Sequence, residues 1–257
     1  MKFRRKTVRE AQWEALDKRE ERFLRKAAQE KQPVLNSQLE RFVPDKLSAA
    51  LDLAFYKAFE LVFEKGTVLI EKTYRREDRE MTYKVNAYAA GLKETRKNMK
   101  AFSRNAKNSS AVNVLTSGAS GIGLGILGIG LPDIPLFTAM ILKGIYEIAI
   151  SYGFPYDTPQ EQCFILKIIR AALLTGDEAV QANEELNRGM DGTSPKDEKK
   201  QQMRLASAAL SHELLYMKFL QGIPIAGAVG GFYDAVYMKK ITDYADLKYK
   251  RRFLSNR

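Results

Sequence analysis

An uncharged, glycine-rich stretch between Lys107 and Asp133 constrains this chain more than any other segment. Its 25 residues, 108–132, contain six glycines and no formal charge. A helix of that length could cross the ~30 Å hydrocarbon core of a bilayer, yet each glycine costs a water-exposed helix about 1 kcal/mol relative to alanine. Four of these glycines recur at helical spacing and would form one smooth face, against which a second helix or a lipid chain can pack closely: Gly118, Gly121, Gly125 and Gly128.

The residues after this stretch predict a helical hairpin rather than one straight membrane span. Pro132 and Pro135 flank Asp133, and prolines at these positions interrupt a helix. A second apolar arm follows over 134–152 and closes at Gly153. A similar glycine-rich segment occurs at 222–235, where Gly227 and Gly231 are four residues apart. Two small-residue faces in one chain predict two closely packed helices, and these glycines form our candidate lipid-binding element.

The rest of the chain also has helical periodicity, and no segment shows convincing strand alternation. We therefore expect an all-α fold, a single multi-helix domain with a central glycine-rich apolar helical hairpin. Residues 1–43 are expected to form a charged N-terminal helical extension, and 44–257 the domain. Gly66 is expected to cap a helix that opens at Asp45, and Thr158 to open another through a capping box with Glu161.

The remaining expected elements are helices over 68–90, 92–107, 159–175 and 200–220, an acidic mobile connection over 176–199, and a basic amphipathic helix at the C-terminus.

The net charge of +11 over 257 residues is concentrated in three blocks, 1–31, 92–107 and 238–257. Basic blocks beside apolar segments favour anionic lipid headgroups as partners, although a solvated surface has the same composition. No nucleic-acid recognition module is recognisable, so we expect no nucleic-acid partner. The expected headgroup contacts come from the middle block: Lys93, Arg96, Lys97, Lys100, Arg104 and Lys107.

Cysteine and histidine usage limits the chemistry. The single Cys163 excludes an intramolecular disulfide, and with the single His212 it excludes the usual His/Cys zinc sites. The string from Gly123 to Gly128 matches a dinucleotide-binding pattern but lacks the strand before it and the long helix after it. We therefore expect no metal and no cofactor. The N-terminus lacks the apolar core of a signal peptide, which favours a cytoplasmic protein at the inner face of the membrane.

Three carboxylates stand among apolar neighbours, where a charge is costly unless it is capped or paired. They are Asp133, Glu147 and Asp234. Asp133 can cap the helix that follows it, and Glu147 can pair with Lys143 at i, i+4. Asp234 lies one turn past Gly230 and could approach the first hairpin. We take these carboxylates as a candidate polar cluster.

Six stretches of the chain together carry a resemblance to a known family: Lys65-Gly66-Thr67, residues 70–73, GIGLPDIPLF (128–137), IYEIAISYGFPYD (145–157), FILKIIRAAL (164–173) and residues 223–254. With these stretches the chain resembles the EcsC family of bacterial proteins over roughly 45–254, nearly all of the chain past its N-terminal helix. The resemblance implies a helical, membrane-associated protein from a family named after a gene found beside an ABC-type exporter, and it carries over no catalytic residues.

These observations favour a binding protein over an enzyme, since no residue constellation specifies an activity. The leading hypothesis is a membrane-peripheral protein that binds lipid, acyl chains or a membrane partner such as a transporter. One alternative is a lipid-directed hydrolase or transferase that uses the carboxylate cluster as acid and base. Another is a soluble scaffold or interaction protein in which the glycine faces only pack the core.

Overall fold

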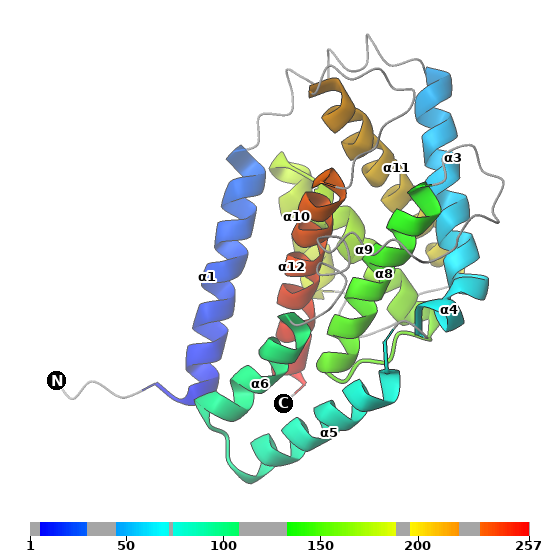
Figure 1. The fold of residues 1–257 in the computed structure, drawn as a ribbon. Coiled ribbons are helices and arrows are strands. Elements are labelled where there is room, and N and C mark those ends of the chain that lie inside the picture. Colours follow the sequence, from blue (N-terminus) through cyan, green and yellow to red (C-terminus); the bar gives the residue numbers. More distant parts are fainter. Residues whose placement is uncertain are drawn as a thin grey trace.

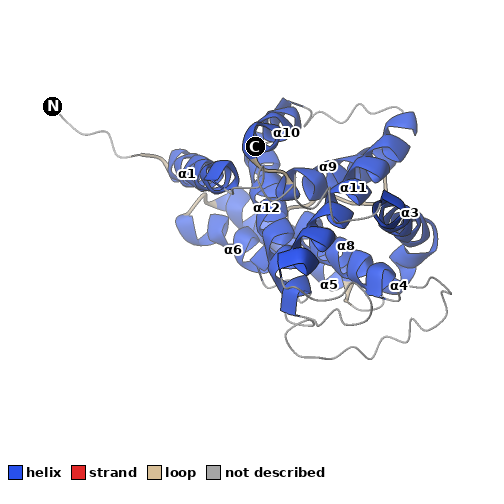
Figure 2. Ribbon diagram, turned by 90° about the horizontal axis from the view of Figure 1, so that it is seen from above, coloured by secondary structure: helices blue, strands red, loops and turns tan. Residues whose placement is uncertain are grey.

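The computed structural model describes residues 6–29, 45–71, 74–107, 133–188, 196–220 and 232–256, and all regular elements in these ranges are helices (Figures 1 and 2). The predicted all-α class is therefore confirmed. In chain order the helices are α1 (Val8–Gln29), α3 (Asp45–Leu61), the π-turn η1 (Val62–Gly66), α4 (Thr67–Glu71), α5 (Arg76–Leu92), α6 (Arg96–Lys107), α8 (Asp133–Ser151), α9 (Pro159–Leu173), α10 (Gly176–Arg188), α11 (Lys196–Leu220) and α12 (Phe232–Ser255).

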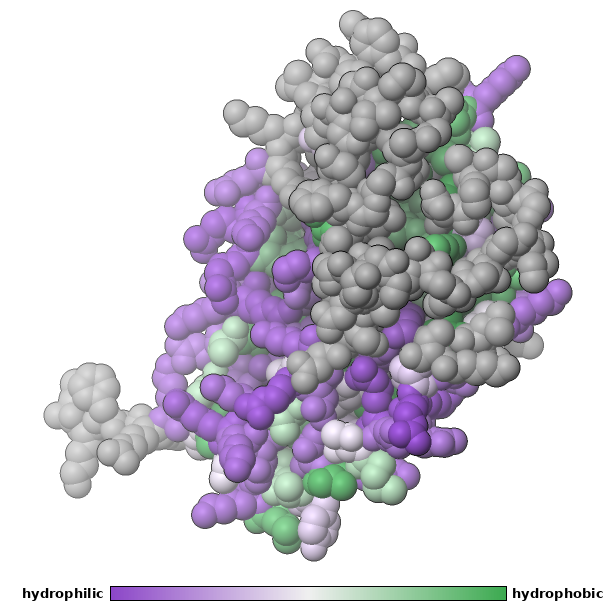
Figure 3. Space-filling view, in the orientation of Figure 1, coloured by the Kyte–Doolittle hydropathy of each residue, from purple (hydrophilic) through white to green (hydrophobic). Residues whose placement is uncertain are grey.

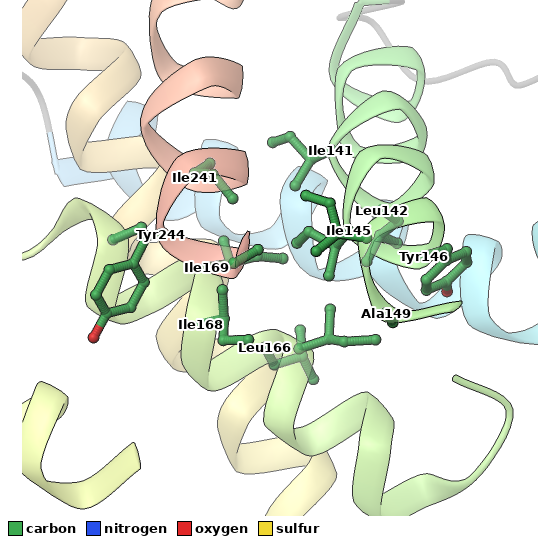
Figure 4. Close-up of a cluster of buried hydrophobic side chains, with 14 of the residues drawn as sticks. Ile141, Leu142, Ile145, Tyr146, Ala149, Leu166, Ile168, Ile169, Ile241 and Tyr244 are labelled. Carbon is green, nitrogen blue, oxygen red and sulfur yellow. The ribbon is translucent and has the colours of Figure 1, made fainter. Parts of the chain in front are cut away.

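Helix α8 is the centre of the core. It packs against α3, α5, α6 and α12, and every residue from 141 to 152 is buried. Figure 4 shows Ile141 and Ile145 of α8 turned toward side chains of α9 and α12. Because this helix is buried on all sides, none of its faces needs to be polar, which explains the near-continuous hydrophobic run in its sequence.

The predicted start of α9 is confirmed. Thr158 has extended backbone and its Oγ1 accepts a hydrogen bond from the Glu161 N–H at 3.2 Å, with Pro159 as the first helical residue. The predicted close of α8 is also confirmed, because Gly153 has a left-handed φ of 85°. There the Phe154 N–H returns to the Ala149 carbonyl at 2.9 Å. Such a return bond satisfies a carbonyl left open at the helix end.

The prediction that Gly66 caps a helix is wrong. The helix continues through Gly66 as a π-turn into α4, and Thr67 donates its hydroxyl back to the Val62 carbonyl at 3.1 Å. The expected helix over 68–90 is also divided, since α4 ends at Glu71 and α5 begins at Arg76. Local capping signals did not distinguish a helix end from a π-turn that lets the helix continue.

Helix α1 is packed on the body of the protein rather than extended from it. It lies along α10 and α12, with Leu16 buried (Figure 1).

The acidic segment expected as a mobile connection is helical over 176–188 and again from 196, and its residues 189–195 lie outside the described part. Its helical part has a buried face of Ala179, Ala182, Asn183 and Leu186, which explains why a charged segment folds here.

Candidate functional site

The basic face of α6 is the part of the predicted lipid-binding site that the structure describes most fully. All six cations expected to contact headgroups have exposed side chains: Lys93, Arg96, Lys97, Lys100, Arg104 and Lys107. Lys93 lies just after α5, and the other five lie on α6 itself. Residues spaced three and four apart share a helix face, so Lys97, Lys100, Arg104 and Lys107 form one row of positive charge.

The opposite face of α6 fixes this row in place. Met99, Phe102 and Ala106 are buried, and the Phe102 ring lies 4.5 Å from that of Phe253 in α12, measured between ring centroids. At the start of the helix the Asn98 N–H donates to the Thr95 hydroxyl at 3.2 Å. The cations therefore project from an anchored helix and not from a loop, which keeps their spacing constant.

A row of exposed apolar side chains runs along α5, the helix before this basic face. The exposed fractions are 61% for Met81, 59% for Val85, 72% for Tyr88 and 72% for Leu92. Figure 3 shows hydrophobic surface at the lower end of the molecule, where Figure 1 places α5. Because α5 packs against α6, the apolar row and the basic row lie on neighbouring helices. We call the two rows together the α5–α6 face.

A shallow hollow of about 230 Å³ lies beside this face. Its walls include Glu80, Tyr83 and Lys84 of α5 and Phe154 and Pro155 of the turn after α8. The ring of Tyr83 rests on Gly153, where an added Cβ would come within 2.2 Å of the ring. That contact explains why the turn needs glycine, and it holds α5 against α8.

The buried carboxylate of Glu147 is the part of the predicted polar cluster that the structure describes. Its side chain is fully buried, and Lys143 donates to Oε1 at 2.8 Å, which confirms the predicted i, i+4 pair. Arg79 of α5 donates to Oε2 at 2.8 Å. A buried carboxylate needs such partners, because an unpaired charge in the core would cost several kcal/mol.

A second chain of polar contacts continues from α4 and α5 toward the start of α9. The hydroxyls of Tyr74 and Tyr156 are 2.5 Å apart, and the Tyr156 hydroxyl donates to Glu71 at 2.6 Å. Arg76 donates to both Glu71 and Asp157, each at 2.6 Å. Burial raises the pKa of both tyrosines above their ordinary value, and the bond to Glu71 raises that of Tyr156 further. Both phenols thus stay protonated at neutral pH and act as hydrogen-bond donors.

These contacts tie α4 and α5 to α8 and to the turn after it. Both oxygens of Glu147 accept bonds from cations, so the geometry is that of a structural ion pair. The side chains of Asp133 and Asp234 lie outside the described residues, and the three-carboxylate cluster stays a prediction. Within the described ranges, no group of three or more histidines, cysteines or acidic residues is placed to hold a metal ion.

The glycine faces also stay predictions, because the glycines from 118 to 128 and Gly227 and Gly231 lie outside the described residues. Among the helices that the structure describes, one has a segment long and apolar enough to cross a membrane. It is Ile134–Ser151 of α8, and 78% of it is buried within the protein. The core helix of a soluble protein can have the same length and composition. Figure 4 shows side chains of α8 within the hydrophobic core.

Sequence reasoning did not single out two features of this region. Arg79 was not paired with Glu147, because the two residues are 68 positions apart and no local spacing connects them. The apolar row of α5 was given no role at a surface. Its i, i+4, i+7, i+11 spacing directly before a basic helix was the available signal that the two form one amphipathic surface.

The described helices define an all-α domain with buried ion pairs and with a basic, partly apolar face at α5 and α6. A model of the EcsC protein family matches residues 10–254, from within α1 to the last turn of α12. The chain therefore belongs to the EcsC family, as the sequence resemblance predicted. No curated protein and no solved structure matches the chain.

Proposed function

We propose that this protein is a peripheral membrane protein that binds anionic bilayers through the α5–α6 face, at the cytoplasmic side of the membrane. The observation that supports this best is the row of cations on α6, exposed side by side on an anchored helix. Each basic side chain near an anionic surface contributes about 1 kcal/mol to binding. The attraction is screened over about 10 Å at 0.1 M salt, so binding weakens as ionic strength rises.

The test is co-sedimentation with vesicles of pure phosphatidylcholine and with vesicles containing 30% phosphatidylserine. A variant in which Lys97, Lys100, Arg104 and Lys107 are changed to Gln removes the row while leaving the buried face of α6 intact. At low salt its affinity for the anionic vesicles should fall by about 4 kcal/mol, roughly 1000-fold. Wild-type protein that ignores both kinds of vesicle would overturn the proposal.

Helix α1 supplies a matched control. Lys18, Arg22, Arg25 and Lys26 are all exposed, and changing them to Gln alters the net charge by the same amount on another helix. This control should keep most of the vesicle affinity. If it lost as much as the α6 variant, binding would depend on net charge alone, and the assignment to the α5–α6 face would be wrong.

A further inference from the structure

The exposed apolar row of α5 has no counterpart among the other described helices. The other large hydrophobic side chains that are more than half exposed are Leu53 in α3 and Val236 in α12, which stand singly. Single exposed apolar residues are normal on a soluble protein, whereas a contiguous row marks an interaction surface. On α5 four such residues follow one another turn by turn over Met81–Leu92.

The position of α5 suits contact with a flat partner. In Figure 1 the helix crosses the lower end of the molecule, transverse to α1, α8 and α12. Its opposite side is held down by the buried Ala90 and by Tyr83 and Ala87, which pack against the core. The apolar row thus points away from the body, and Lys84 adds an exposed cation on the same helix.

The positive charge beside this row indicates which kind of partner covers it. A symmetric contact with a second copy through the α5–α6 face would bring two basic helices together, and like charges repel. An anionic bilayer provides opposite charge for α6 and an apolar layer for α5. A helix with apolar side chains on one side and cations beside them lies in the plane of such an interface, with its apolar face buried about 5–10 Å deep.

From this arrangement we propose that α5 is an interfacial anchor. Met81, Val85, Tyr88 and Leu92 insert below the headgroups of an anionic bilayer while the α6 cations contact the headgroups. This inference rests on the proposed function and adds to it that attachment is partly hydrophobic. Tyr88 suits the boundary because its ring is apolar and its hydroxyl can stay among the headgroups.

The depth of α5 is measured with an environment-sensitive fluorophore on a single introduced cysteine. Val85→Cys places the fluorophore on the row, and Leu53→Cys, at a site 55% exposed, is the matched control. The native Cys163 is buried and should not be labelled. With vesicles containing 30% phosphatidylserine, emission from position 85 should shift to the blue and be quenched by nitroxide-labelled lipid. Emission from position 53 should not change.

A variant with all four row residues changed to Ser tests the contribution to binding. These side chains are exposed, so the variant should fold, which circular dichroism and the urea midpoint verify. Its affinity for anionic vesicles should fall at least tenfold, and the fraction that stays bound in 0.5 M salt should disappear.

The outcomes separate this inference from the proposed function. Wild-type binding that is fully reversed by salt, with no blue shift at position 85, would overturn insertion and leave the electrostatic proposal standing. Absence of any vesicle binding would overturn both. Concentration-dependent dimers that the serine variant abolishes, in a protein that ignores vesicles, would reassign the row to a second copy.

Discussion

Two basic segments of equal net charge differ in this protein in whether their cations are exposed or buried. Residues 92–107 carry six basic and one acidic side chain, and residues 238–257 carry seven and two. On α6 the cations face solvent. On α12 Lys248 is fully buried, and Arg251 and Arg252 are largely covered.

Partners from distant segments account for the difference. Lys248 donates to Glu20 of α1 and to Asn183 of α10, both at 2.5 Å. Arg252 donates to both oxygens of Glu161 in α9, at 2.9 and 2.7 Å. Lys248 and Arg252 of α12 therefore join helices together, whereas the cations of α6 are available to an external anion. Net charge per segment is a poor guide to a binding surface unless the internal partners are known.

The largest expected effect comes from removing the buried cation of α12. Lys248→Met leaves Glu20 buried with one partner fewer, and breaking a buried pair costs about 3–5 kcal/mol. Urea denaturation should show a correspondingly lower midpoint, and adding Glu20→Gln should restore part of it. The matched change Lys100→Met on α6 should leave the midpoint nearly unchanged. If Lys248→Met and Lys100→Met lowered the urea midpoint equally, the buried cation of α12 would stabilise the fold no more than an exposed cation of α6.

A somewhat smaller loss is expected at the ion pair between α5 and α8. Glu147→Gln removes the charge shared by Arg79 and Lys143, and hydrogen bonds to charged groups contribute about 1.5–3 kcal/mol. The control is Glu80→Gln, because the Glu80 carboxylate that pairs with Arg76 is 42% exposed and such pairs contribute less than about 1 kcal/mol. A Glu147 variant as stable as the Glu80 variant would show that the buried pair adds nothing.

The titration of Lys248 should make the stability of the protein depend on pH. Burial lowers the pKa of Lys248 from 10.5 to about 8, with Glu20 opposing the shift. Between these values an unfolded chain keeps the Lys248 proton that the folded chain releases, so the contribution of Lys248 to the free energy of unfolding should rise as the pH increases from 8 to 10.5. Buried tyrosines with raised pKa values oppose this rise at the upper end of the window, so the measurement is the difference between the wild type and Lys248→Met in urea melts at each pH. A difference that does not change with pH would contradict the shift.

The smallest stability effect belongs to α6. Changing Lys100 and Arg104 to Ala should alter the free energy of unfolding by no more than about 0.5 kcal/mol, as for surface substitutions away from special contacts. The same variant should bind anionic vesicles measurably less well. A large drop in its unfolding midpoint, with vesicle affinity unchanged, would show that these cations are structural after all.

Local chemistry made part of the fold predictable. The capping box at Thr158, the turn at Gly153 and the pair of Glu147 with Lys143 each depend on residues within a few positions of one another, so the sequence contains the whole interaction. The prediction at Gly66 was wrong because the residues near it do not determine whether the helix ends there. Its neighbours permit both a helix end and a π-turn, and the continuation of the helix into α4 was not encoded in the capping residues alone.

The sequence by itself determined the all-α class, the family, most helix positions and which residues share a face. Periodicity identifies a face but carries no information on whether another helix covers it. Only the tertiary structure decided that the apolar row of α5 is exposed, that Arg79 reaches Glu147, and that Lys248 is internal while Lys100 is not. These outcomes depend on side chains tens to hundreds of residues apart, and packing alone brings them together.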